Sequence, residues 1–164
     1  MITIDSQIWI YYFDPNAKEN KNVLHWMRKH LQTSDILLNI IIPTEVAHNL
    51  YTIPKISRNL IEQLLFKWIT QKNITIADLS NKEMINALQK LKTLRSHGIG
   101  GRDCLILATM DFFEVKTIVT NDKNLLIQTD LQRINPIFDP PLILERGESF
   151  NLQRYKENLK SLYL

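Results

Sequence analysis

The sequence is poor in the features that mark secreted or membrane proteins. Its single cysteine, Cys104, excludes a disulfide within the chain, which favours a reducing setting. No apolar run approaches the roughly 20 residues that span a bilayer. No N-terminal segment has the basic start and the long apolar stretch that are typical of a secretory signal. We therefore expect a soluble, cytoplasmic protein.

Strong compositional bias is also absent. No segment is of low complexity, and 45% apolar and 9% aromatic residues argue against disorder. The 20 Lys and Arg residues exceed the 17 Asp and Glu residues by only three, a weak lean toward anionic partners that strengthens if several acids are confined to one site. With 164 residues, the chain can bury one sizeable core, so we expect a single domain over residues 1–164.

Short aliphatic runs alternate with amphipathic segments. The pattern predicts strands over residues 2–4, 36–42, 74–77, 117–120 and 134–138. It predicts helices over residues 7–13, 17–31, 57–71, 80–97, 104–113, 124–128 and 149–164, with a further helix that begins near residue 44. Strands that alternate with helices indicate an α/β sandwich with a parallel sheet.

Local signals place the ends of two helices. Pro43 is expected to stop the strand over residues 36–42, and Thr44 to cap the helix that follows. Glu45 would then lie in a first turn, where the helix dipole favours an anion. Ser80 and Glu83 have the spacing of a capping box and predict a helix start.

Four carboxylates lie at or just past the ends of apolar runs: Asp5, Glu45, Asp103 and Asp122. Open α/β sheets place ligand sites at the carboxyl ends of their strands, so we expect the four acids at one edge of the sheet. Two unit charges about 4 Å apart repel by about 4 kcal/mol at an effective dielectric constant near 20. A hard divalent cation is the simplest compensation, and it could orient a water for attack on a phosphodiester.

Four segments, in this order, resemble the acidic motifs of the PIN-domain family: Ile4-Asp5-Ser6, Pro43-Thr44-Glu45-Val46, Arg102-Asp103-Cys104-Leu105-Ile106-Leu107-Ala108 and Val119-Thr120-Asn121-Asp122. The resemblance covers roughly residues 1–140. It implies a Rossmann-like, three-layer α/β/α sandwich with a central, mainly parallel sheet of four to five strands. It also implies a ribonuclease that depends on Mg²⁺ or Mn²⁺ and is specific for single-stranded RNA.

Many members of this family are toxins of toxin–antitoxin pairs, so the resemblance further implies a homodimer and an antitoxin partner. It places Asp5, Glu45, Asp103 and Asp122 on the four acidic positions. Ser6 and Asn121 fall where small polar residues support the site. Residues 141–164 would form a C-terminal extension that ends in an amphipathic helix.

The roles of these side chains remain open at the level of sequence. Each acid has a structural alternative, as a turn residue, a first-turn acid or a helix cap. Their joint placement favours a metal site in which Asp5, Asp103 and Asp122 hold the ion, while Glu45 ligates it or positions the water. Flanking basic residues could contact RNA phosphates or simply be solvated; they are Arg95, His97, Arg102 and Lys123.

Three other functions compete with a nuclease toxin. One is a housekeeping RNA-processing nuclease of the same type, and another is a module that binds RNA or protein without cleaving. The third is a phosphotransfer domain. A dehalogenase-like phosphatase needs a D-x-D pair, and Asp5-Ser6-Gln7 lacks the second acid. The intact acidic set argues against the non-cleaving module.

Overall fold

The structure, a computed structural model, describes residues 1–54 and 57–163. Within these residues the central sheet has six strands in the order β3-β2-β1-β4-β5-β6. The strands are β1 (Ile2–Ile4), β2 (Ile36–Asn39), β3 (Ile74–Ala77), β4 (Thr117–Val119), β5 (Gln132–Asn135) and β6 (Leu142–Leu144). All neighbouring strands pair in parallel except β6, which runs antiparallel to β5.

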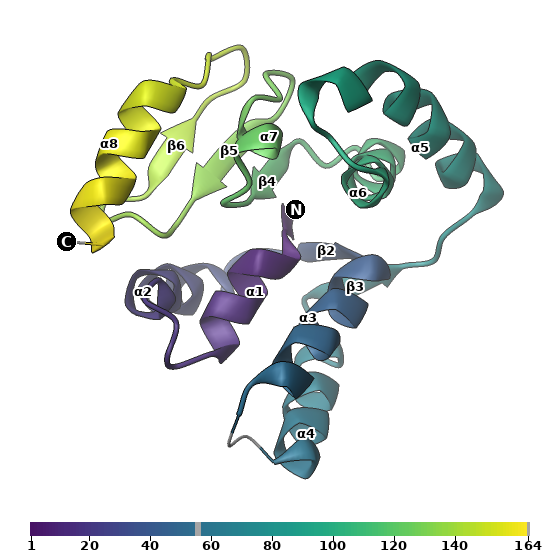
Figure 1. The fold of residues 1–164 in the computed structure, drawn as a ribbon. Helices are drawn as coiled ribbons and strands as arrows, with labels where there is room; N and C mark the ends of the chain where they lie inside the picture. The colour runs from purple at the N-terminus through teal and green to yellow at the C-terminus, as the bar shows by residue number, and fades with distance from the viewer. Residues whose placement is uncertain (55–56, 164) are drawn as a thin grey trace.

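Helices cover the sheet. They are α1 (Ser6–Phe13), α2 (Asn20–His30), α3 (Ile41–Thr52), α4 (Arg58–Ile69), α5 (Asn81–Leu94), α6 (Gly101–Phe112), α7 (Lys123–Leu126) and α8 (Leu152–Tyr163). A short 3₁₀ turn, η1 (Arg95–His97), follows α5. In Figure 1, α1 to α4 gather on one side of the sheet and α5 and α6 on the other, with α8 beside β6. None of the helices in the described ranges has the length and apolar character needed to cross a membrane.

The core lies where the central strands meet the helices. Every residue of β2 is buried, as are Ile4 of β1 and Val119 of β4. Strands buried on both faces consist of near-continuous aliphatic runs, which is why these segments are recognisable in the sequence. The predicted α/β architecture with a mainly parallel sheet is confirmed. The sheet also contains β6, which was not predicted, and β5 begins two residues earlier than expected.

The boundary between β2 and α3 differs from the prediction. The strand ends at Asn39 instead of residue 42, and the helix begins at Ile41. The buried Asn39 side chain causes the change of direction, because its Oδ1 accepts a hydrogen bond from the Ile41 N–H at 2.9 Å. Pro43 does not stop the strand. It lies in the first turn of α3, where a missing N–H costs little.

Two predictions that depended on this boundary are therefore wrong. Thr44 does not cap α3, since it lies inside the helix and its hydroxyl donates to the Ile40 carbonyl at 3.0 Å. Glu45 is not in the first turn, which contains no acidic residue. The helix dipole therefore gives Glu45 no first-turn stabilisation, and another group must balance its charge.

The predicted capping box at the start of α5 is confirmed. The Glu83 Oε2 accepts from the Ser80 N–H at 2.9 Å, and the Ser80 hydroxyl accepts from the Glu83 N–H. Thr109 of α6 donates to Glu83 and accepts from the Asn39 amide at 2.7 Å. Burial would raise the pKa of Glu83, but hydrogen bonds from Ser80 and Thr109 bring that pKa below its ordinary value. This buried chain of bonds joins α5 and α6 to the end of β2.

Candidate active site

Asp5 lies at the carboxyl end of β1, directly before α1. Its backbone N–H donates to the Val119 carbonyl at 2.9 Å, which continues the pairing of β1 with β4. The carboxylate is only 7% exposed. The Thr120 hydroxyl donates to its Oδ2 at 2.8 Å, and the Ser6 hydroxyl lies 3.4 Å from its Oδ1. The structure thus directs the Ser6 hydroxyl toward the Asp5 carboxylate.

Asp103 lies in the first turn of α6, after the turn that contains Gly98 and Gly100. Gly98 has a φ of 78°, a left-handed conformation that glycine adopts without strain. The Asp103 Oδ2 accepts from the Gly100 N–H at 3.0 Å. The carboxylate therefore closes the start of α6, and its other oxygen remains available for further contacts.

Asp122 follows β4 and caps α7. Its Oδ1 accepts from the Asn124 N–H at 2.7 Å. Its own N–H donates to the Thr120 hydroxyl at 3.0 Å. Thr120 is fully buried and joins the two ends of the site, because it donates to Asp5 and accepts from Asp122. Thr120 was quoted within a motif but given no role. The signal for its role is its position: Thr120 follows β4 directly, as Asp5 follows β1, and Ile4 pairs with Val119.

The three aspartates come close enough to influence one another's charge. Burial raises the pKa of Asp5 to about 6, the Thr120 hydrogen bond opposes this, and the negative charges of Asp103 and Asp122 raise it further. Burial also raises the pKa of Asp103. The hydrogen bond from the Gly100 N–H lowers this pKa, the negative charge of Asp122 raises it, and the positive charge of Arg102 lowers it. The site therefore holds more negative charge than its surroundings balance.

The donor chemistry of this site fits a hard cation, since the three aspartates present carboxylate oxygens from separate elements. Each uses an oxygen for a named hydrogen bond, and a carboxylate can accept about four. Over residues 1–54 and 57–163, no three acidic, His or Cys side chains already lie at ligand distances from a common point. The carboxylates would have to draw together to share one ion.

Glu45 reaches the same region from α3, but it is engaged by a cation. Its Oε1 accepts from the Arg102 guanidinium, and the two form an ion pair. The Glu45 side chain is 16% exposed and the Arg102 side chain 71%. Because Arg102 directly precedes Asp103, this pair brings Glu45 to the start of α6. It also supplies the positive charge that the helix dipole does not.

Asn121 precedes Asp122 and is held by two side chains. Its Oδ1 accepts from the Asn135 amide at 2.9 Å and from the Tyr155 hydroxyl at 2.6 Å. Burial raises the pKa of Tyr155 to about 12; a hydrogen bond with Asn135 lowers it, and Tyr11 and Asp122 raise it. Tyr155 was not predicted as a site residue, because an aromatic residue on an amphipathic helix gives no signal beyond packing.

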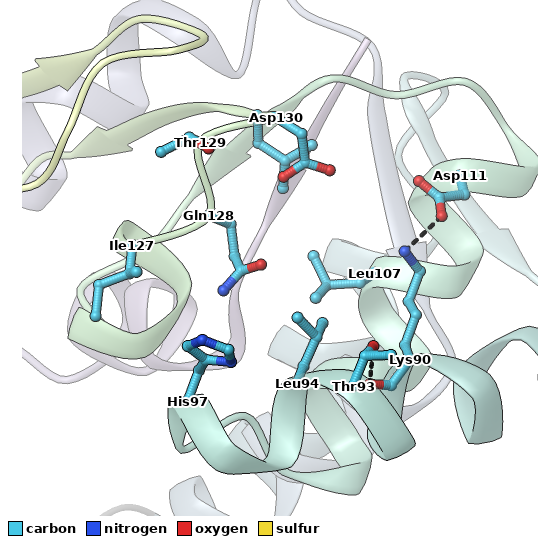
Figure 2. Close-up of a pocket in the computed structure, with 11 residues that line it drawn as sticks. Lys90, Thr93, Leu94, His97, Leu107, Asp111, Ile127, Gln128, Thr129 and Asp130 are labelled. Carbon is cyan, nitrogen blue, oxygen red and sulfur yellow. Dashed lines mark hydrogen bonds and ion pairs between the residues drawn. The ribbon is translucent and has the colours of Figure 1, made fainter.

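The remaining basic candidates are exposed. Lys123 begins α7, and Arg95 and His97 lie in η1. His97 lines a cavity of about 420 Å³ between α5, α6 and the segment after α7. Figure 2 shows this cavity, with Lys90 paired to Asp111 at 2.7 Å on one side. The described lining residues include none of the four acids, so this cavity is separate from the acidic site.

The family model described as the PIN domain matches residues 2–130. The chain therefore belongs to the PIN-domain family, and the resemblance noted for its acidic motifs is confirmed. The matched residues contain Asp5, Glu45, Asp103 and Asp122, whereas β5, β6 and α8 lie beyond them.

Solved structures share this fold at low sequence identity. FitAcB from Neisseria gonorrhoeae aligns with a TM-score of 0.59 and 20% identity, over 83% of this chain and 98% of that one. VapC20 from Mycobacterium tuberculosis, a sarcin-ricin loop cleaving toxin, aligns at 0.64 and 9%, over 75% and 91%. A toxin–antitoxin complex from Klebsiella pneumoniae aligns at 0.60 and 14%, over 83% and 98%. No curated protein sequence matches the chain.

Proposed function

We propose that this protein is a metal-dependent endoribonuclease that hydrolyses phosphodiester bonds in single-stranded RNA. The observation that carries the proposal is the buried carboxylate of Asp5, whose pKa is raised to about 6 by burial first and further by the negative charges of Asp103 and Asp122. Carboxylates gathered without a balancing cation are costly, and a hard divalent ion is the partner that such oxygens suit. Membership of the PIN-domain family supports the same chemistry.

In this proposal Asp5, Asp103 and Asp122 hold Mg²⁺ or Mn²⁺. When bound, the ion supplies positive charge and activates a water for attack on the phosphodiester. Thr120, Gly100 and Asn124 donate to one oxygen of each aspartate and so fix the direction in which the other oxygen points.

Glu45 and Arg102 act together at the rim of the site. Arg102 is exposed and suited to bind a phosphate oxygen of the RNA. When the Arg102–Glu45 ion pair separates, Glu45 is free to ligate the metal ion or to position the attacking water. Lys123, Arg95 and His97 are exposed and extend the basic surface that a polyanion would meet.

The biological role that we propose is that of the toxin in a toxin–antitoxin pair. Solved structures of the same fold include a cleaving toxin and a toxin–antitoxin complex, which supports an antitoxin partner. We further propose a homodimer in the cytoplasm, where the buried, unpaired Cys104 would stay reduced.

The direct test is cleavage of a labelled single-stranded RNA in Mn²⁺ by the wild type, Asp5→Asn and Asp103→Asn. Asparagine keeps a hydrogen-bond acceptor for Thr120 or Gly100 but removes the charge. We expect a loss of at least about 100-fold in kcat for both variants, in the upper range found when metal-site residues are changed. The circular dichroism spectra should be unchanged.

Asp35→Asn is the matched control. Asp35 is exposed and precedes β2, so it lies at the opposite edge of the parallel sheet from Asp5, which follows β1. Its activity should equal that of the wild type. Full cleavage by Asp5→Asn, or cleavage by the wild type in excess EDTA, would rule out the metal-dependent mechanism. RNA binding without any cleavage would favour the non-catalytic module.

A further inference from the structure

The C-terminal helix reaches the acidic site through one side chain. The hydroxyl of Tyr155, in the first turn of α8, donates to Asn121 at two atoms: Oδ1 at 2.6 Å and the main-chain oxygen at 3.2 Å. These bonds span 34 residues of sequence. Tyr155 is 7% exposed, so both bonds are shielded from water. The helix is therefore tied to the turn that carries Asp122.

Packing holds the Tyr155 ring in place. Phe138 and Phe150 meet it edge to face, with ring centroids 5.7 Å and 5.2 Å away. The ring also belongs to a small buried cluster with Leu126 of α7 and Leu144 of β6. Figure 1 shows α8 beside β6, with α7 and β5 next to them. A side chain fixed on several sides directs its hydroxyl to one place, at little cost in rotamer entropy.

Tyr155 contacts both sides of α7, the shortest α-helix in the described part of the chain. α7 has four residues, too few for an isolated helix to be stable in water. Contacts with α8 reach both ends of α7: Tyr155 bonds Asn121 just before the cap, and it shares a buried cluster with Leu126, the last residue of the helix. Asp122 lies between these two points. Its carboxylate is therefore placed by a helix outside the 2–130 segment that the PIN model matches.

We propose that Tyr155 is a positioning residue for the acidic site: it fixes the Asn121–Asp122 turn so that the Asp122 carboxylate faces Asp5 and Asp103. The extension over residues 141–164 would then be a working part of the nuclease. This inference rests on the proposed function, since it assigns a role in holding the metal ion.

The test is Tyr155→Phe, which removes the hydroxyl and keeps the ring in its aromatic contacts. Mn²⁺ affinity is measured by isothermal titration calorimetry in the absence of RNA, and cleavage is measured separately. We expect Mn²⁺ binding about 10-fold weaker, at the lower end of the effect of residues that orient metal ligands. We expect kcat to fall by a similar factor, with the KM for RNA unchanged.

Tyr12→Phe is the matched control. Tyr12 is a half-buried aromatic residue that also contacts other rings, but its hydroxyl makes no hydrogen bond within the described residues. Removal of the Tyr12 hydroxyl should leave the Mn²⁺ affinity and kcat at wild-type values. Unfolding temperatures of both variants are recorded, so that a purely structural effect is visible as a lower Tm alone.

A double-mutant cycle of Tyr155→Phe with Asn121→Ala tests whether Tyr155 acts through Asn121. If Tyr155 acts through Asn121, the loss of Mn²⁺ affinity in the double variant will be smaller than the sum of the two single losses. Additive losses would overturn that route. Wild-type Mn²⁺ affinity and kcat in Tyr155→Phe would overturn the positioning role while leaving the nuclease intact. A wild type that neither binds Mn²⁺ nor cleaves RNA would refute the proposed function itself, and this inference with it.

Discussion

Thr120 is the residue on which the geometry of the site depends most directly. A hydroxyl can donate one hydrogen bond and accept others, and Thr120 uses both capacities. It donates to Asp5 and accepts from the Asp122 N–H. Two of the three aspartates are therefore tied to one buried hydroxyl directly after β4. This arrangement orients Asp5 without neutralising its charge.

Thr120→Val should destabilise the protein by about 1–3 kcal/mol, because it leaves two polar partners unsatisfied at nearly constant volume. The free energy of unfolding in urea measures this loss. Thr3→Val is the control, since the Thr3 hydroxyl is buried with no hydrogen-bond partner in the described part of the chain. That variant should be as stable as the wild type or more so. Equal effects of the two substitutions would contradict the account of Thr120.

The raised pKa of Asp5 predicts how stability changes with pH when metal is removed by EDTA. Its pKa is about 6 in the folded protein and has an ordinary value of 3.8. As pH rises, the Asp5 carboxyl loses its proton at a lower pH in the unfolded chain than in the folded protein. The contribution of Asp5 to stability is therefore largest below about pH 4 and is lost as pH rises through 6. Two pKa units correspond to about 3 kcal/mol at most.

Urea unfolding at pH 5 and pH 7 measures this slope. Asp5→Asn should reduce the fall in unfolding free energy between the two pH values, because the variant has no proton to lose at this position. Asp35→Asn should keep the wild-type slope. An unchanged slope in Asp5→Asn would mean that Asp5 titrates normally in the folded protein.

At the scale of elements, the sequence predicts those features that local chemistry determines. The capping box of Ser80 and Glu83 and the aliphatic run of β1 need no distant partner, and the structure has both where expected. The run from Ile36 to Ile42 was predicted as a single strand because it is nearly all aliphatic and precedes Pro43, but the strand ends at Asn39. The Asn39 side chain decides the boundary through one local bond, from the Ile41 N–H, and one distant bond, to Thr109.

Contacts between distant elements were beyond the same reasoning. The pairing of Glu45 with Arg102 depends on how α3 meets α6, and the bond from Tyr155 to Asn121 depends on how α8 meets α7. No local pattern encodes either contact. β6 was missed because it joins the sheet only through its antiparallel pairing with β5, which the alternation of strands and helices does not predict. Asp5 and Asp122 could be proposed as site residues from sequence because parallel strands bring their carboxyl ends to one edge of the sheet.

Asn39→Ala tests the boundary between β2 and α3. The substitution removes the acceptor for the Ile41 N–H and the donor to Thr109, both in a buried setting. We expect a loss of about 2–4 kcal/mol in unfolding free energy, the sum of two buried polar groups left without a partner. Asn59→Ala, at an exposed position of α4, should change it by less than about 0.5 kcal/mol. A small effect at Asn39 would contradict its role.

At the scale of the whole molecule, the fold gathers negative charge on a protein with a net charge of +3. Three aspartates converge from the end of β1, the start of α6 and the turn after β4. The rest of the surface is correspondingly more basic. This division suits a polyanionic substrate that is attracted by the surface and meets a cation in the acidic site.

The most direct measurement of the central claim is a crystal structure of the protein grown with MnCl₂, with anomalous diffraction to locate manganese. The account predicts an anomalous peak among Asp5, Asp103 and Asp122, with oxygens of at least two of them at about 2.0–2.2 Å, close to the distances known for Mg²⁺. Absence of that peak at Mn²⁺ concentrations that support cleavage would contradict it. Manganese bound elsewhere, with these carboxylates apart, would contradict it equally.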